Sequence, residues 1–433
     1  MSRSTQSRSI TSRLDVSRSA LRVLGVVVAA TAVATGCTTN GNPQPSPSAA
    51  GETQAAIDLA ALDTGSYPTE PREPFGRATD AEIVQVEAQR MAQFIVVPFE
   101  VDGDLTNQKM PTQTIASRKN FTMILGPEAV DVPANEFLLG GYTTTASTPD
   151  SHLRAGTARS LNNMVVRYAD ANHARMAARQ MADALATRDK TELTGLPGEP
   201  TAIVKRTSVG GNEQMLAFTP HNSYVLYQWV ETTPEQEDLL EPTLRKALSL
   251  QRTLIDQFPA TPTKAEAAER GITGSVRPYV DQDRVLIYAL PMTDEELQTG
   301  GTFGPGHQLR AVYGPRGRAH TSTDPKTTFT VLTETGSTAN AVERSIVYRA
   351  ATPDGATAIM EADAGPGDTS TPIDPPPGLA TAECSKSVGQ DTMYSCHVQE
   401  GRYVGYVRSD DITDAYQQIS AQYVILTKAD QDA

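Results

Sequence analysis

The segment TAIVKRTSVG at residues 201–210 recurs downstream as TAECSKSVG at residues 381–389. Shorter matches precede both segments. MVVRYA, residues 164–169, comes before the first, and SIVYRA, residues 345–350, comes before the second. Because similar segments recur in the same order, we predict that the chain uses one structural unit twice.

Each copy is predicted to form a strand, a helix, three antiparallel strands and a closing helix. Asp170 is of the type that caps a helix start, and Thr233 is predicted to cap the closing helix, with Pro234 at its first position and Gln236 reaching back. Pro259 ends that helix. β-Branched and aromatic runs predict the strands of the first copy, at residues 163–168, 202–207, 214–218 and 223–230.

The second copy repeats this order with one insertion. Thr352 is predicted to start a short helix through Met360, and the proline-rich residues 363–378 are predicted to form a mobile surface loop. Cys384 and Cys396 then fall on adjacent strands. The predicted fold class is α+β, with two similar lobes that are each a mainly antiparallel sheet packed by helices.

Residues 1–36 have the pattern of an export signal. Five arginines precede an uncharged apolar run at residues 23–33, as in the charged and apolar regions of a signal peptide. The run is shorter than the ~20 apolar residues that span a bilayer. Small residues and Cys37 follow directly, so we predict a cleaved signal rather than a membrane-spanning helix.

The end of this signal, Ala34-Thr35-Gly36-Cys37, resembles the lipobox of bacterial lipoproteins. The resemblance implies that the Cys37 thiol carries a diacylglyceryl group and that cleavage makes Cys37 the first residue. Ala34 departs from the family pattern, which usually has a large aliphatic residue there. An ordinary secretory signal with a nearby cysteine is the alternative. Two or three acyl chains, at about 0.8 kcal/mol per buried CH₂, hold a protein stably on a bilayer.

The region after Cys37 supports a surface location. Residues 38–51 alternate proline with small polar residues and are predicted to be an extended tether. With its lipobox, tether and doubled body, the chain resembles the uncharacterised exported lipoproteins of actinobacteria such as nocardiae. The resemblance covers most of the chain after residue 36. It implies a lipid-anchored position on the outer face of the cell membrane and no particular chemistry, because that family has no established activity.

Export also bears on the other two cysteines. Once Cys37 carries lipid, Cys384 and Cys396 are the only cysteines left. In an oxidising compartment we expect this pair to form a disulfide. Two free thiols that never meet are the alternative.

The charge of the chain limits its partners. Removal of residues 1–36 takes away five arginines and one aspartate, which changes the net charge from −14 to −18. An acidic body repels nucleic acid and anionic lipid headgroups. We therefore expect no nucleic-acid partner, and membrane contact only through the N-terminal lipid.

The chain is predicted to divide into five parts. The capping pair Thr79 and Glu82 opens the first lobe with a helix to about Phe94.

Residues 121–125 are β-prone, and the rest of 95–142 has no assigned architecture. Residues 285–290, VLIYAL, are predicted to be a buried strand. The parts are 1–36 (signal peptide), 37–78 (tether and docking segment), 79–260 (first lobe), 261–284 (connector) and 285–433 (second lobe).

Motifs for catalysis, metal binding or cofactor binding are not found. The six histidines are scattered, without an H-E-x-x-H pair, and neither a G-x-S-x-G elbow nor an S-x-x-K motif occurs. Residues 102–104 lack EF-hand spacing, and the glycine-rich residues 300–306 lack the lysine of a phosphate loop. Residues 314–318 are predicted to be a solvated basic turn. We expect no catalytic residue, no metal and no cofactor.

One histidine and three aromatic residues are expected to have structural roles. His173 is expected to be a packed residue at a helix edge rather than a base. Tyr224, Tyr227 and Trp229 lie on one predicted strand and are expected to belong to the core rather than to a ligand platform.

Three functions stay open from the sequence. The first is a lipoprotein that binds a small molecule or an envelope protein between two lobes, because clefts at domain interfaces often form binding sites. The second is a structural component of the cell envelope. The third, which we expect least, is an enzyme whose residues meet only in the fold.

Overall fold

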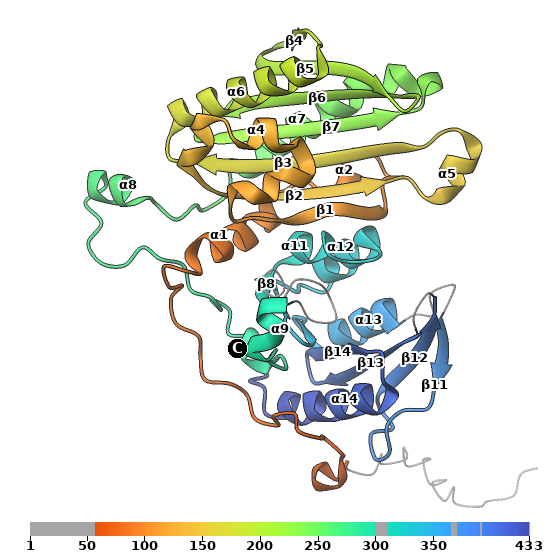
Figure 1. Cartoon of the computed structure of the whole chain (residues 1–433). Helices are drawn as coiled ribbons and strands as arrows, with labels where there is room; N and C mark the ends of the chain where they lie inside the picture. The colour runs from red at the N-terminus through yellow and green to blue at the C-terminus, as the bar shows by residue number, and fades with distance from the viewer. Residues whose placement is uncertain (1–56, 300–309, 365–369, 390–391, 433) are drawn as a thin grey trace, which may run out of the picture. The chain divides into compact units, whose positions relative to one another are not determined.

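The computed structural model in Figure 1 describes residues 57–299, 310–364, 370–389 and 392–432. The predicted signal peptide, Cys37, the tether at 38–51 and the glycine-rich residues 300–306 lie outside these ranges. None of the helices in the described ranges has the length and apolar character that crossing a bilayer requires.

The first lobe is built on a seven-stranded antiparallel sheet in the order β1-β2-β3-β7-β6-β5-β4. Alternate residues of the central strands face two separate apolar clusters, one on each side of the sheet. The strands are β1 (Asn107–Ile115), β2 (Leu138–Ser147), β3 (Arg159–Tyr168), β4 (Leu193–Leu196), β5 (Glu199–Val209), β6 (Asn212–His221) and β7 (Tyr224–Thr232).

Helices cover both faces of this sheet (Figure 1). α6 (Ala171–Asp189) packs against one face, and Asp170 accepts hydrogen bonds from the Asn172 and His173 amides as the predicted cap. α7 (Leu240–Ile255) packs against the other face through its apolar stripe. Short helices complete the lobe: α2 (Pro98–Val101), η3 (Arg118–Phe121), α3 (Thr122–Leu125), α4 (Pro127–Val130), η4 (Pro133–Phe137), α5 (Asp150–Ala155), η5 (Pro234–Leu239) and α8 (Lys264–Glu269).

The second lobe has the same sheet topology. Its strand order is β11-β12-β13-β14-β10-β9-β8. Read from the β8 edge, this is the first-lobe order with each strand replaced by its counterpart, so that β8 corresponds to β1 and β11 to β4. The strands are β8 (Ala311–Tyr313), β9 (Ala339–Val342), β10 (Ile346–Arg349), β11 (Ser370–Ile373), β12 (Glu383–Val388), β13 (Thr392–Glu400) and β14 (Tyr403–Ser409), and the helices are η6 (Leu286–Tyr288), α9 (Asp294–Thr299), α11 (Pro315–Ala319), α12 (Pro325–Glu334), α13 (Pro353–Ala364) and α14 (Ile412–Leu426). The predicted α+β fold with two similar lobes is confirmed.

The ladder register fixes which residues of the two lobes correspond. Met164 lies opposite Tyr227 in the first lobe, and Ile346 lies opposite Tyr406 in the second. Met164 therefore corresponds to Ile346, and the sequence match that aligned it with Ser345 is wrong by one residue. In a strand, a shift of one residue moves every side chain to the other face.

Two predicted strands are helical instead. Residues 121–125 lie in η3 and α3, and residues 285–290 contain η6. The Asp281 carboxylate accepts hydrogen bonds from the Val285 and Ile287 amides and so holds this buried turn. A short run that is apolar on all sides does not distinguish a strand from a buried helix, which is why the pattern misled.

Two other local predictions are also corrected. Thr233 stands at the N-cap of η5 with Pro234 at its first position, as predicted, but its hydroxyl donates to the Gly156 carbonyl and makes no capping bond, and Gln236 leaves the helical conformation instead of reaching back. The loop predicted at 363–378 is partly regular, because α13 continues to Ala364 and β11 pairs with β12. Pro372 is compatible with this pairing since β11 is an edge strand.

The segment before the first lobe packs on the second lobe. Leu62 is buried in the second-lobe cluster beside α14. The Tyr67 hydroxyl donates to Asp414 at 2.5 Å, and the Arg72 guanidinium binds Glu343 and the Leu286 carbonyl. Residues 57–78 thus form an ordered strap rather than a free linker.

The two lobes share one apolar cluster, in which Tyr142 and Leu226 of the first lobe join Tyr313 and Ile359 of the second. α11 lies at this contact, so the prediction of a solvated basic turn at 314–318 is wrong. Gln93 follows α1 (Ile83–Met91) within η2 (Ala92–Phe94), and its side-chain oxygen accepts the amides of α11 at Arg316 and Gly317. Beside it, the Arg316 guanidinium binds the Glu100 carboxylate.

His320 follows α11 and is buried in the first lobe with 0% exposure. Its Nδ1 lies 3.0 Å from the Thr144 hydroxyl, and its Nε2 lies 3.1 Å and 3.2 Å from the carbonyls of Ala92 and Ile95. Burial, with the charge of Arg316, lowers the pKa of His320 to about 3. The ring is therefore neutral at physiological pH.

We predict that His320→Gln removes part of the acid sensitivity of the fold. The pKa of His320 is near 3 when folded and ~6.5 when unfolded, so the unfolded state binds the proton more strongly between these values. The stability that the neutral His320 ring contributes is therefore fully present above about pH 6.5 and is lost as pH drops toward 3. Urea unfolding from pH 7.5 to 4.5 should show that the free energy of unfolding of wild type exceeds that of His320→Gln by less at lower pH, with a decrease of up to about 1.4 kcal/mol per pH unit. A difference that does not change with pH would contradict this.

Cys384 and Cys396 are directly paired on β12 and β13 and joined by a disulfide. Their counterparts in the first lobe, Val204 and Ala217, are a directly paired apolar couple on β5 and β6. The same sheet position is therefore filled without a covalent bond in the first lobe.

We predict that Cys384→Val/Cys396→Ala folds but is less stable by about 3 kcal/mol, the chain-entropy estimate for a short loop. The residues introduced are those of the first lobe, so no new cavity or polar group is expected. Urea unfolding measures the loss, and far-UV circular dichroism checks the sheet. A variant that equals the oxidised wild type in stability, or that lacks the sheet signal, would be evidence against this role.

Candidate functional site

The second lobe carries polar side chains where the first lobe has core. His397 lies opposite Tyr406, as Phe218 lies opposite Tyr227. Asp363 is the eleventh residue of α13, where α6 has Met181. Phe218 and Met181 are both fully buried in an apolar cluster. Replacing such residues by ionisable ones costs stability unless their polar atoms are paired.

His397 and Asp363 are paired with each other. His397 Nε2 lies 3.1 Å from Asp363 Oδ2, and the imidazole packs on the Tyr406 ring with centroids 4.6 Å apart. His397 is only 4% exposed, whereas the Asp363 side chain is 28% exposed. A nearly buried imidazole is thus held by a carboxylate at the edge of the solvent.

Arg318 approaches the same carboxylate from α11. It is 6% exposed, and its Nη2 donates to the Tyr348 hydroxyl at 2.9 Å. Asp363 lies near that hydroxyl, which lowers the pKa of its carboxyl. Tyr348 corresponds to the buried Val166 of the first lobe, so this position has also become polar. Arg318, Tyr348, Asp363 and His397 thus form one row of neighbouring polar side chains, which we call the second-lobe polar chain.

Opposing effects set the charge of Asp363. Burial raises its pKa, but the hydrogen bond and charge of His397, the charge of Arg318 and the Tyr348 hydroxyl lower it more. The net result is an Asp363 pKa below its usual range, so this carboxyl is ionised at neutral pH. Burial raises the pKa of Tyr348, which keeps its hydroxyl protonated as a donor.

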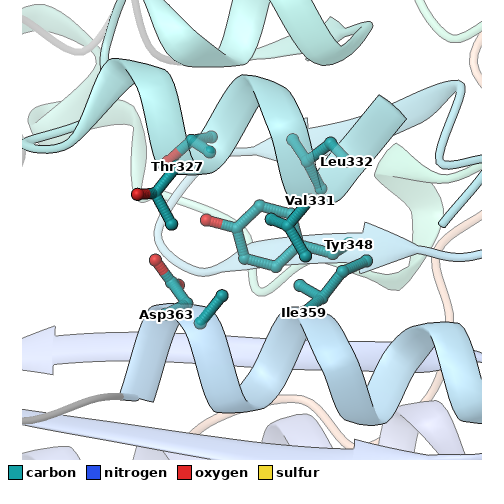
Figure 2. A pocket seen from close by; sticks show the side chains of 8 residues that line it. Thr327, Val331, Leu332, Tyr348, Ile359 and Asp363 are labelled. Carbon is teal, nitrogen blue, oxygen red and sulfur yellow. The ribbon is translucent and has the colours of Figure 1, made fainter. Parts of the chain in front are cut away.

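A small cavity borders this chain between α12 and α13. Figure 2 shows the Tyr348 hydroxyl and the Asp363 carboxylate on the same side of it, near Thr327. Its volume is about 10 Å³, and Val331 and Ile359 form its apolar wall.

A larger hollow lies beside His397, where the helix cover differs between the lobes. α6 has 19 residues and α13 has 12. The additional turns of α6 bury Leu185 and place Asp189 2.6 Å from Lys205 of the first sheet. The hollow has a volume of about 350 Å³. We call it the His397 hollow, and it is lined by Pro372, Ile373, Ala382, Glu383, Cys384, Ser385 and His397.

Two family descriptions match the chain. The domain of unknown function DUF7373, N-terminal, matches residues 74–268, and its C-terminal counterpart matches residues 289–429. Together these ranges cover more than half of the chain. The chain belongs to the DUF7373 family.

Other comparisons add little to this assignment of the DUF7373 protein. No curated protein matches it. Among solved structures, the extracellular domain of PknH from Mycobacterium tuberculosis is similar with 10% identity and a TM-score of 0.28, over 42% of this chain and 99% of that one. A likeness at this TM-score supports no statement about fold or function.

The residues weighed from the sequence lie apart from the polar chain. His173 stacks on Phe137 and lies 2.9 Å from Asp170. Tyr224 and Tyr227 are buried, as expected of core residues, and Trp229 is partly buried. Asp102 and Asp104 both bind Arg159. In the described ranges, no three histidine, cysteine or carboxylate side chains are grouped to hold a metal ion.

The second-lobe polar chain of this DUF7373 protein was not predicted from the sequence. One signal was present in the repeated segments, since Glu383 stands where the first copy has Ile203. The pairing of His397 with Asp363 had no signal of its own. A strand and a helix far apart in sequence supply the two side chains, and the match of Met181 to Asp363 depends on the register.

We predict that Asp363→Asn destabilises the second lobe by about 2–3 kcal/mol. This is less than the loss expected for a fully buried pair, because the side chain is partly exposed. The ionised Asp363 has a lowered pKa, so its contribution is present above the unfolded value of ~3.9 and is lost as pH falls through the folded value. Urea unfolding at pH 7 and pH 3 should show a large difference between wild type and variant at pH 7 and a small one at pH 3.

The matched control is Asp183→Asn on α6, whose carboxylate pairs with Arg179 on the exposed helix surface. Exposed pairs contribute little to stability. Equal effects of the two substitutions would show that the second-lobe polar chain has no special energetic role.

Proposed function

We propose that this DUF7373 protein is an exported lipoprotein, anchored through Cys37 to the outer face of the cell membrane, that binds a ligand in its second lobe without being an enzyme. The observation that carries the binding proposal is the second-lobe polar chain. It occupies positions that are apolar core in the first lobe. A departure of this kind from a packed core is typical of a functional site.

The first lobe is proposed to be the scaffold. It has the same topology, and its corresponding positions Met181, Phe218 and Val166 are filled by close apolar packing. A polar set that only stabilised the fold would be expected in both copies. Its restriction to one copy favours a ligand-binding role for that copy.

We place the ligand within the second lobe rather than between the lobes. The described contact between them is filled by the shared apolar cluster, by α11 and by the buried His320. Filled contacts of this kind leave the lobes packed as a unit. The His397 hollow, in contrast, exposes ionisable and hydroxyl side chains to a ligand.

The proposed export rests on the sequence of residues 1–37. A charged and apolar signal ending in a lipobox-like cysteine favours it, and the Cys384–Cys396 disulfide fits an oxidising compartment. The alternative, a structural component of the envelope, predicts large flat contacts and no bound small molecule.

The test is native mass spectrometry of the full protein purified from its own membrane. We expect an acyl mass on Cys37 and a bound mass that is retained in wild type and lost in His397→Phe, which carries the first-lobe residue at that position. Metabolic labelling with a fatty-acid analogue should mark the wild type and not Cys37→Ala.

The two parts of the proposal fail separately. An unlabelled wild type, with Cys37→Ala equally membrane-bound, would disprove lipid anchoring. A protein that never carries a bound mass would favour the structural alternative.

A further inference from the structure

The geometry points to a positively charged hydrogen-bond donor, an ammonium or guanidinium group on a partly apolar molecule, as the ligand of the His397 hollow. This inference rests on the proposed binding function and names the chemical class that the hollow accepts. It is carried by the orientation of one imidazole, by an unpaired carboxylate beside it and by the character of the surrounding wall.

Asp363 decides which way His397 presents its ring nitrogens. An ionised carboxylate can only accept hydrogen bonds, so His397 Nε2, 3.1 Å from Asp363 Oδ2, is the donor. In a neutral ring, Nδ1 then carries a lone pair and is an acceptor. Within the described ranges no side chain or amide donates to Nδ1. His397 is only 4% exposed, and it lines the hollow. While the ring is neutral, the hollow therefore contains a pre-oriented acceptor without a donor among the described residues.

Glu383 supplies a second acceptor next to the first. It is the direct cross-strand neighbour of His397, and side chains in such pairs lie on the same face of the sheet. Glu383 is exposed, and no lysine or arginine of the described ranges forms an ion pair with it. A lone-pair nitrogen beside a free carboxylate is complementary to a cationic donor and repels an anion.

The charges around the His397 hollow also favour a cationic ligand. Glu383 also borders an adjoining hollow of about 530 Å³, whose lining includes Glu361 and Met360 of α13. The described residues that line the two hollows include no lysine or arginine. Pro372 and Ile373 of β11 add apolar surface beside the acceptors, which suits the hydrocarbon part of an amine.

The first lobe provides an internal comparison. Its residues at the positions of His397 and Glu383 are Phe218 and Ile203, and α6 covers that part of the sheet. The fold therefore accepts apolar side chains at both positions. A variant with these residues in the second lobe, His397→Phe/Glu383→Ile, is expected to fold and to lack both acceptors.

The experiment is isothermal titration calorimetry of the full chain in detergent with agmatine, which has a guanidinium and an ammonium group on a butyl chain. Glutarate, a dianion of similar length, is the opposite-charge probe. Glu383→Gln removes the charge within the hollow. Glu192→Gln is its matched control, because it removes the same charge from an exposed first-lobe residue.

We expect agmatine to bind wild type and Glu192→Gln saturably and with equal affinity, Glu383→Gln at least tenfold more weakly, and His397→Phe/Glu383→Ile not measurably. Urea unfolding of each variant checks that it is folded. Agmatine binding that is equal in all variants, or absent from wild type, overturns the inference.

The remaining outcomes separate this inference from the proposed function. Glutarate binding that depends on His397 would keep the hollow as a binding site and reject its charge preference. If wild type carries a natural bound mass that His397→Phe loses, but wild type does not bind agmatine, the hollow also remains a binding site and its charge preference is rejected. No probe binding and no bound mass would reject both.

Discussion

The pairing of β3 with β7, and of β10 with β14, is the constraint on which the rest of the structure depends. Met164 opposite Tyr227 and Ile346 opposite Tyr406 set which side chains of each central strand face α6 or α13, and which face the opposite side. Since side chains alternate along a strand, this register fixes the composition of both faces at once. Every correspondence between the lobes follows from it.

Once the register is fixed, the two lobes differ in a way that has a physical meaning. The disulfided pair of one lobe is the apolar Val204 and Ala217 of the other, a difference that leaves the sheet unchanged. Asp363 and His397 in place of Met181 and Phe218 are of another kind. Ionisable groups at core positions are stabilised only by each other and by Arg318 through Tyr348. A duplicated fold can keep one copy for packing and use the other for chemistry.

The contact between the lobes and the second-lobe polar chain both use residues of α11. Arg316 and Arg318, two residues apart on α11, point to different partners: Glu100 of the first lobe and Tyr348 of the second. His320 follows them into the first lobe as a neutral ring. One helical turn therefore connects the lobe contact with the polar chain, and the position of Arg318 depends on both.

The sequence by itself determined the doubled α+β architecture, the closing helices and the Asp170 cap, because periodic apolar patterns and caps are local signals. It also predicted the pairing of Cys384 with Cys396 as a hypothesis from their number and neighbouring strands. Only the tertiary structure decided that residues 285–290 form a turn around Asp281, that 314–318 is buried at the lobe contact, and that Asp363 meets His397. Each of these depends on side chains that are distant in sequence, and a one-residue change in register would have placed His397 on the opposite face of the sheet from Asp363.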